Sequence, residues 1–219
     1  MNFTIRLAVV LLAVAFPAML AAQDPRSPDA VARGLQARYQ GVQDFSANFV
    51  QTYRGGVLKT GSTSRGTVAV KKPGKMRWIY TSPERQEIVS DGRQTFWYVP
   101  EDKQVTVTDV GDDDQALPAL FLSGKGDIGR DFTPSFVKAS SASLLALKLV
   151  PRKMQPEYEY LVVALDPASL QMRALTTYDS QGGQSLIEFN NMKENSRLSD
   201  KDFVFRIPRG VKVVTDGTR

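Results

Sequence analysis

Apolar and polar residues alternate along most of the chain, and turn-forming residues interrupt the alternation at short intervals. In the segment FSANFVQTY, Phe45, Ala47 and Phe49 fall on one face, whereas Ser46 and Asn48 fall on the other. A period of two is typical of a β-strand with one buried face. The chain is therefore predicted to be rich in short strands.

Short turns separate the strands that this pattern predicts. Pro73-Gly74, Ser82-Pro83 and Asp91-Gly92 stand between apolar runs, and Asp-Gly is a strong signal of a hairpin. Short strands joined by short turns indicate an antiparallel sheet in meander order. The predicted strands span residues 45–53, 66–72, 76–81, 85–90, 94–99, 104–110, 144–150, 158–165, 170–178, 184–192 and 203–207.

Three segments have helical features instead. Ser27 and Pro28 are typical of an N-cap and a first helical position, and the apolar residues that follow recur every four positions. Residues 115–124 predict a short helix that ends at Gly124, and residues 199–203 predict one turn before the final strand. The apolar positions of the first helix are Val31, Leu35 and Tyr39.

The fold class that follows is mainly β with short helices (α+β). About ten or eleven antiparallel strands have an apolar face that must be covered, and the two longer helical segments are available as covers. We therefore expect an incomplete antiparallel β-barrel with a helical lid. Its interior is either filled by side chains or holds an apolar ligand, and the pattern leaves both alternatives open.

The first 22 residues have the composition of a secretory signal peptide. One basic residue, Arg6, precedes an apolar run from Leu7 to Leu20, and small residues follow. Gln23 stands where a bacterial lipoprotein would carry its lipid-modified cysteine. We expect residues 1–22 to be removed and residues 23–219 to form a single exported domain without a lipid anchor.

Composition excludes several classes of chemistry. The chain has no histidine and no cysteine, so it has no serine–histidine triad, cysteine nucleophile or histidine or thiolate zinc site. The net charge of +5 is spread over the chain, and the basic cluster at residues 71–77 lacks a nucleic-acid-binding motif. The carboxylates of residues 109–115 lack the spacing of a calcium loop. We expect no cofactor, no metal and no nucleic-acid partner.

A carboxylate-dependent glycosidase remains an alternative, since such an enzyme needs only two suitably placed carboxylates. The candidate residues are Glu84, Glu87, Glu157 and Glu159. Each lies beside a turn or in an alternating segment, where an acidic side chain usually faces solvent.

Five segments together resemble a known family. They occur in the order FSANFVQT, GTVAVKKPGKMRWIYTSP, EIVSDGRQTFWYVPEDKQVTV, LPALFLSG and DKDFVFRIPRGVKVV. In this order and spacing the chain resembles the periplasmic outer-membrane lipoprotein carriers of the LolA family, over essentially the whole mature length.

The resemblance implies a function as well as a fold. Members of the family have an incomplete barrel under a helical lid, and they carry the acyl chains of lipoproteins across the periplasm. They receive this cargo from the inner-membrane transporter LolCDE and pass it to the outer-membrane receptor LolB. The resemblance therefore implies a monomeric, non-enzymatic carrier. A paralogue that carries another lipid, or that senses mislocalised lipoproteins, is the alternative within the same fold.

The resemblance also assigns roles to individual residues. Lys72 occupies the position of an arginine that closes the lid, and lysine keeps the charge but loses the planar guanidinium. The alternative for Lys72 is an ordinary solvated lysine. The alternative for each apolar position that follows is ordinary core packing. The residues expected to bind lipid are Met76, Trp78, Ile88, Phe96, Leu120 and Leu122.

Overall fold

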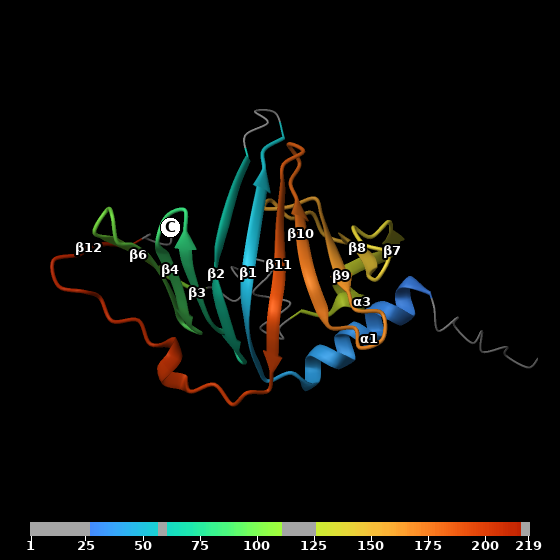
Figure 1. Ribbon diagram of the computed structural model, residues 1–219, viewed down its shortest axis with the longest axis horizontal. Coiled ribbons are helices and arrows are strands. Elements are labelled where there is room, and N and C mark those ends of the chain that lie inside the picture. Colours follow the sequence, from blue (N-terminus) through green and yellow to red (C-terminus); the bar gives the residue numbers. More distant parts are fainter. Residues whose placement is uncertain (1–26, 57–60, 111–125, 216–219) are drawn as a thin grey trace, which may run out of the picture.

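Twelve strands form one open, curved sheet in the computed structural model, which describes residues 27–56, 61–110 and 126–215 (Figure 1). The strand order is β12-β6-β5-β4-β3-β2-β1-β11-β10-β9-β8-β7. The elements are α1 (Pro28–Gly41), β1 (Asp44–Arg54), β2 (Gly61–Lys71), β3 (Lys75–Ser82), β4 (Gln86–Asp91), β5 (Gln94–Val99), β6 (Gln104–Asp109), α3 (Ile128–Asp131), β7 (Phe132–Val137), β8 (Leu145–Pro151), β9 (Tyr160–Leu165), β10 (Met172–Tyr178), β11 (Gln184–Glu194), the 3-10 helix η1 (Asp200–Phe203) and β12 (Lys212–Thr215).

The connectivity joins two meanders. Strands β1 to β6 follow one another across half of the sheet, β7 to β11 follow one another across the other half, and β1 pairs with β11 at the centre. All neighbours are antiparallel except β12, which lies parallel to β6. The predicted antiparallel sheet is confirmed, and its strands follow one another in meander order except where the chain crosses over between β6 and β7.

Helix α1 begins and packs as its sequence predicts. The Ser27 side chain accepts a hydrogen bond from the Ala30 amide, which satisfies one of the free N–H groups of the first turn, and Pro28 occupies that turn. One face of the helix, with Leu35 and Tyr39, is buried in the main core. The helix thus covers part of the inner face of the sheet, which we define as the face that carries Phe49 and Trp78.

The two halves of the inner face are buried to different extents. Beneath α1, aligned residues of β8, β9 and β10 such as Leu147, Val163 and Leu175 are completely or almost completely buried. On β3 and β4, by contrast, Met76 and Ile88 remain half-buried. Side chains therefore fill the interior on one side and leave apolar side chains partly uncovered on the other.

The C-terminal part differs from the prediction. Residues 204–208 do not form a strand; the last strand is β12, at residues 212–215. The reason is that Ser199 and Asp202 form a capping box around η1 and bury Phe203 against the outer face of the sheet. The segment then runs along the sheet to its far edge, where β12 joins β6 (Figure 1).

Besides β12, two elements have no counterpart among the predicted ones. Helix α3 has only four residues, and β7 contains Pro134, a residue that is unfavourable within most strands. Proline is tolerated in β7 because this strand is at the edge of the sheet. The predicted signal peptide (residues 1–22) and the whole of the predicted helix at residues 115–124 lie outside the described residues. Among the helices that the structure describes, none is long and apolar enough to cross a membrane.

Candidate functional site

Three of the predicted lipid-binding residues lie together on the inner face. Trp78 of β3 is directly opposite Ile88 of β4 and Val68 of β2, and Met76 is in the next row, opposite Val70. Trp78 is 8% exposed and packs edge-on against Phe49 at 5.0 Å. These side chains form a continuous apolar surface.

A second tryptophan extends this surface toward the edge of the sheet. Trp97 of β5 is directly opposite Ile88, so its indole lies on the inner face, and it remains 50% exposed. The sequence interpretation did not select Trp97, although alternation along β5 provides the signal. A half-exposed tryptophan beside Ile88 leaves a large apolar ring available to a ligand.

Phe96, which was expected to bind lipid, lies on the opposite, outer face. It is paired with Val89, and its ring stacks on Phe205 at 5.4 Å. Tyr98 also contacts the ring of Phe205, at 5.7 Å. Phe96 therefore belongs to a small cluster under the C-terminal segment, and the register separates it from Trp78 and Ile88.

Lys72 contacts the end of helix α1. Its ammonium donates a hydrogen bond to the carbonyl of Tyr39, in the last turn of the helix, and its backbone N–H donates to Gln43 at 2.9 Å. Partial burial lowers the pKa of Lys72. The contact is of the kind expected for a residue that holds a covering helix, because the carbonyls of the last helical turn lack partners within the helix.

Other contacts attach the same helical turn to the sheet. The Tyr39 hydroxyl accepts a buried hydrogen bond of 3.0 Å from the backbone N–H of Met172, and burial raises the pKa of Tyr39 to about 12. Arg38 forms an ion pair with Glu194 on β11, which raises the pKa of Arg38. The C-terminal turn of α1 is thus held to both meanders.

The carboxylates considered for a glycosidase lie in ordinary surface environments. Glu87 is on the outer face, and its Oε1 forms an ion pair with Arg77 Nε at 2.6 Å. Glu84, Glu157 and Glu159 are exposed. In the part of the chain that the structure describes, no group of three or more acidic residues is placed to bind a metal ion. The predicted residues Leu120 and Leu122 lie outside the described residues.

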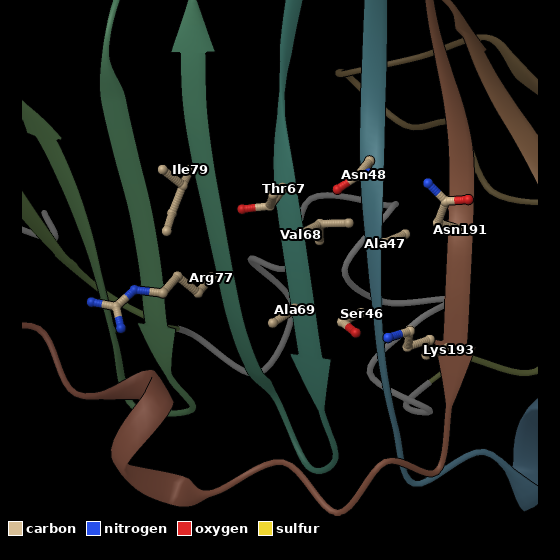
Figure 2. A pocket seen from close by; sticks show the side chains of 10 residues that line it. All are labelled: Ser46, Ala47, Asn48, Thr67, Val68, Ala69, Arg77, Ile79, Asn191 and Lys193. Atoms are coloured by element: carbon tan, nitrogen blue, oxygen red, sulfur yellow. The ribbon is translucent and has the colours of Figure 1, made fainter.

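Two hollows lie on the outer face in the described part of the chain, and polar and apolar groups line both of them. The first, of about 630 Å³, is lined by residues that include Asn48, Thr67, Asn191 and Lys193 (Figure 2). The second, of about 980 Å³, lies between the serine-containing residues 138–144 and strands β8 to β11. Their hydroxyl, amide and charged groups make them poor sites for hydrocarbon compared with the apolar inner face.

Comparison with known proteins tests the resemblance. Residues 40–206 match the model of the family described as outer membrane lipoprotein carrier protein LolA. The chain belongs to the LolA family. The match includes all of the strands from β1 to β11 and the Lys72, Met76, Trp78 and Ile88 positions.

Individual relatives agree with this assignment. The outer-membrane lipoprotein carrier protein of Hahella chejuensis is 30% identical over 183 residues, which are 83% of this chain and 87% of the relative. The protein of the same description from Neisseria gonorrhoeae is 32% identical over 175 residues, which cover 78% and 81% of the two chains. These similarities extend over nearly the whole LolA fold.

A solved structure shows the same fold at low sequence identity. An uncharacterized conserved protein from Thermus thermophilus superposes with a TM-score of 0.52 at 11% identity, covering 85% of this chain and 98% of the other. This similarity concerns the fold alone.

Proposed function

We propose that the protein is a non-enzymatic carrier that binds the acyl chains of lipoproteins on its apolar inner face. Its membership of the LolA family and the lipoprotein carriers among its relatives support this role. The observation that carries the proposal is the partly uncovered surface of Met76, Ile88 and Trp97 around the buried Trp78, in a domain whose other half is tightly packed.

The free energy lost when an acyl chain is exposed to water explains why such a carrier needs an apolar surface. Burial of one methylene group contributes about 0.8 kcal/mol, so an acyl chain of about fifteen methylenes loses on the order of 12 kcal/mol when it is fully exposed to water. Free diffusion of a lipoprotein between membranes is therefore negligible. A carrier has to cover the chains and still release them, which favours a flexible apolar surface over tight complementarity.

The route of the cargo is the finer part of the proposal. We infer that the protein works in the periplasm as a monomer, receives lipoproteins from LolCDE and delivers them to LolB. The signal-peptide pattern of residues 1–22 supports export, and Gln23 in place of a cysteine supports release without a lipid anchor. Residues 23–219 then form one carrier domain.

Within this proposal, Met76, Trp78, Ile88 and Trp97 bind hydrocarbon, and Lys72 holds the cover closed when the carrier is empty. Phe96 is left out of the lipid-binding set because of its place on the outer face. Leu120 and Leu122 keep their proposed lid role on the basis of the family resemblance alone.

The test is a release and transfer experiment with the mature protein. It is added to spheroplasts that carry an acylated lipoprotein, and the soluble complex is then mixed with membranes that contain LolB. The proposal expects the lipoprotein first in the supernatant and then in the LolB membranes. Absence of both steps, with a folded protein, would contradict the carrier function.

A pair of variants links the activity to the inner face. Met76→Glu places a charge on the apolar surface, where an unpaired ion is costly, and should lower release at least ten-fold. Ile79→Glu on the outer face of the same strand is the matched control and should release cargo like the parent. If both variants lose activity only in proportion to unfolding, Met76 is a core residue without a binding role.

A further inference from the structure

The inner face changes from apolar to polar along its strands. Beyond the rows of Met76 and Trp78, the next inner-face positions are Tyr80 on β3 and Gln86 on β4, which are directly opposite each other. Two residues along a strand span about 7 Å. The hydrocarbon-binding surface therefore ends at a band of hydrogen-bonding side chains, which we call the polar band: Gln51, Tyr80, Gln86, Trp97 and Ser185.

The aromatic members of the polar band are amphipathic at this boundary. The Tyr80 ring packs edge-on against Phe49 at 4.9 Å, while its hydroxyl donates to Gln51 Oε1 at 2.8 Å. The Trp97 indole lies beside Ile88, while its Nε1–H donates to Gln86 Oε1 at 2.9 Å. Tyrosine and tryptophan are suited to sites where one end of the side chain is apolar and the other end is polar.

The hydrogen bonds determine which groups of the band remain available. Indole Nε1 is a donor only, so the Gln86 oxygen must face Trp97 and the amide N–H groups must face away from it. Both polar atoms of the Gln51 amide are hydrogen-bonded, because its oxygen accepts from Tyr80 and its Nε2 donates to Ser185 Oγ at 2.9 Å. Within the described part of the chain, the Gln86 amide nitrogen has no hydrogen-bond acceptor. Its two N–H donors thus lie at the edge of the apolar surface, without a partner among the described residues.

We propose that the polar band is a subsite for the root of the acyl chains, with the Gln86 amide donating to an ester or amide carbonyl oxygen of the lipid. This inference rests on the proposed carrier function and adds the chemistry that distinguishes an acylated lipoprotein from plain hydrocarbon. The chains contact Met76, Trp78 and Ile88, and the carbonyls at which they are attached lie about 7 Å further along the strands. Half-exposed Trp97 covers the junction between the two parts.

The proposal makes the carbonyl itself the recognised group. Two synthetic lipopeptides test this: one carries two palmitoyl chains on a glyceryl thioether through esters, and the other carries the same chains through ethers, without carbonyls. The parent protein should bind the diester about 2- to 10-fold more tightly than the diether, which is the range expected for one neutral hydrogen bond. Equal affinity for the two lipopeptides would overturn the subsite.

The variant Gln86→Leu tests whether Gln86 causes the preference for the diester. Gln86→Leu should bind the diester as weakly as the diether and should bind diphenylhexatriene, a hydrocarbon probe, like the parent. The matched control is Gln94→Leu, whose glutamine lies on the outer face of β5 and donates to Asp109 at 2.8 Å, and which should keep the ester preference. An unchanged ester preference in Gln86→Leu would overturn the role of Gln86.

The outcomes separate this inference from the function beneath it. If the parent binds neither lipopeptide nor diphenylhexatriene, the carrier function itself fails. If the parent binds both lipopeptides and the hydrocarbon without preference, the carrier function stands and the subsite is wrong. Should Gln86→Leu not fold, the ester and ether affinities of the parent decide the question.

Discussion

Lys72 joins the turn between β2 and β3 to the last turn of α1 through one hydrogen bond, to the Tyr39 carbonyl. If this bond holds the empty carrier closed, cargo must break it, so that the bond weakens loading and favours release. Lys72→Leu should therefore retain cargo about five-fold more strongly, which corresponds to a net hydrogen bond of about 1 kcal/mol. The measurement is transfer of a bound lipoprotein to its receptor, with hydrogen exchange of residues 38–42.

Lys72→Arg is the control for this prediction, because arginine restores the charge and adds a planar donor. It should transfer cargo at least as well as the parent. If the leucine and arginine variants both transfer and exchange like the parent, Lys72 is a surface residue and other contacts must hold the helix.

Tyr39 should contribute to stability through its buried hydroxyl. Tyr39→Phe leaves the Met172 N–H without its acceptor, so the free energy of unfolding should fall by about 1–3 kcal/mol. Urea unfolding at neutral pH measures this loss. Tyr53→Phe, at a tyrosine that is 41% exposed, is the control and should be nearly neutral.

The raised pKa of Tyr39 predicts that the stability of the folded protein depends on pH. The pKa of Tyr39 is about 12 in the folded protein, above its ordinary value near 10. Between these values the unfolded chain loses this proton while the folded protein keeps it, so the contribution of Tyr39 to stability falls as the pH rises from 10 to 12. Tyr39→Phe should reduce this decline, and an identical pH profile for both proteins would contradict the assignment.

The contrast between Phe96 and Trp97 shows what sequence can predict at single positions. The resemblance located Met76, Trp78 and Ile88, and all three share the inner face. A two-residue hairpin loop joins β4 and β5, so each even-numbered residue of β4 is opposite an odd-numbered residue of β5. Residues directly opposite each other share a face, so Ile88 must share a face with Trp97 and not with Phe96. The register was therefore available from the sequence once the loop length was known.

At the scale of elements, the C-terminal segment is held mainly by one buried ring. Phe203 is 1% exposed, and Phe203→Ala should lower the free energy of unfolding by about 3–5 kcal/mol. Asp200→Asn removes ion pairs to Lys71 at 2.7 Å and Lys75 at 3.1 Å, but it should change stability little because the carboxylate is exposed. Urea unfolding of both variants tests this order, and a larger effect for Asp200→Asn would contradict it.

Elements were predictable where a periodic pattern coincided with local signals. Ser27 and Pro28 located the start of α1, and alternation located ten strands that the structure contains. The strand predicted at residues 203–207 failed because its aromatic residues pack on the outer face of the sheet without joining it. That choice depends on tertiary contacts with β3 to β5, which alternation does not encode.

At the scale of the whole molecule, one curved sheet has two different halves. Under α1 the inner face is filled by aliphatic side chains, whereas on β3 to β5 Met76, Ile88 and Trp97 remain partly uncovered. The sequence pattern left a filled interior and a ligand-binding interior as alternatives. The structure combines them, because the filled half stabilises the domain and the other half supplies the surface for acyl chains in the proposed carrier.

The most direct test of this account is to find where an acyl chain lies on the protein. A diacyl lipopeptide with a diazirine at the end of one chain is bound to the mature protein and photolysed, and the labelled residues are identified by mass spectrometry. The account predicts labels on inner-face residues such as Met76, Ile88 and Trp97, removed by excess unlabelled lipopeptide. Saturable labels confined to the outer-face hollows, at residues such as Asn48 and Thr67, or labels that no competitor removes, would contradict it.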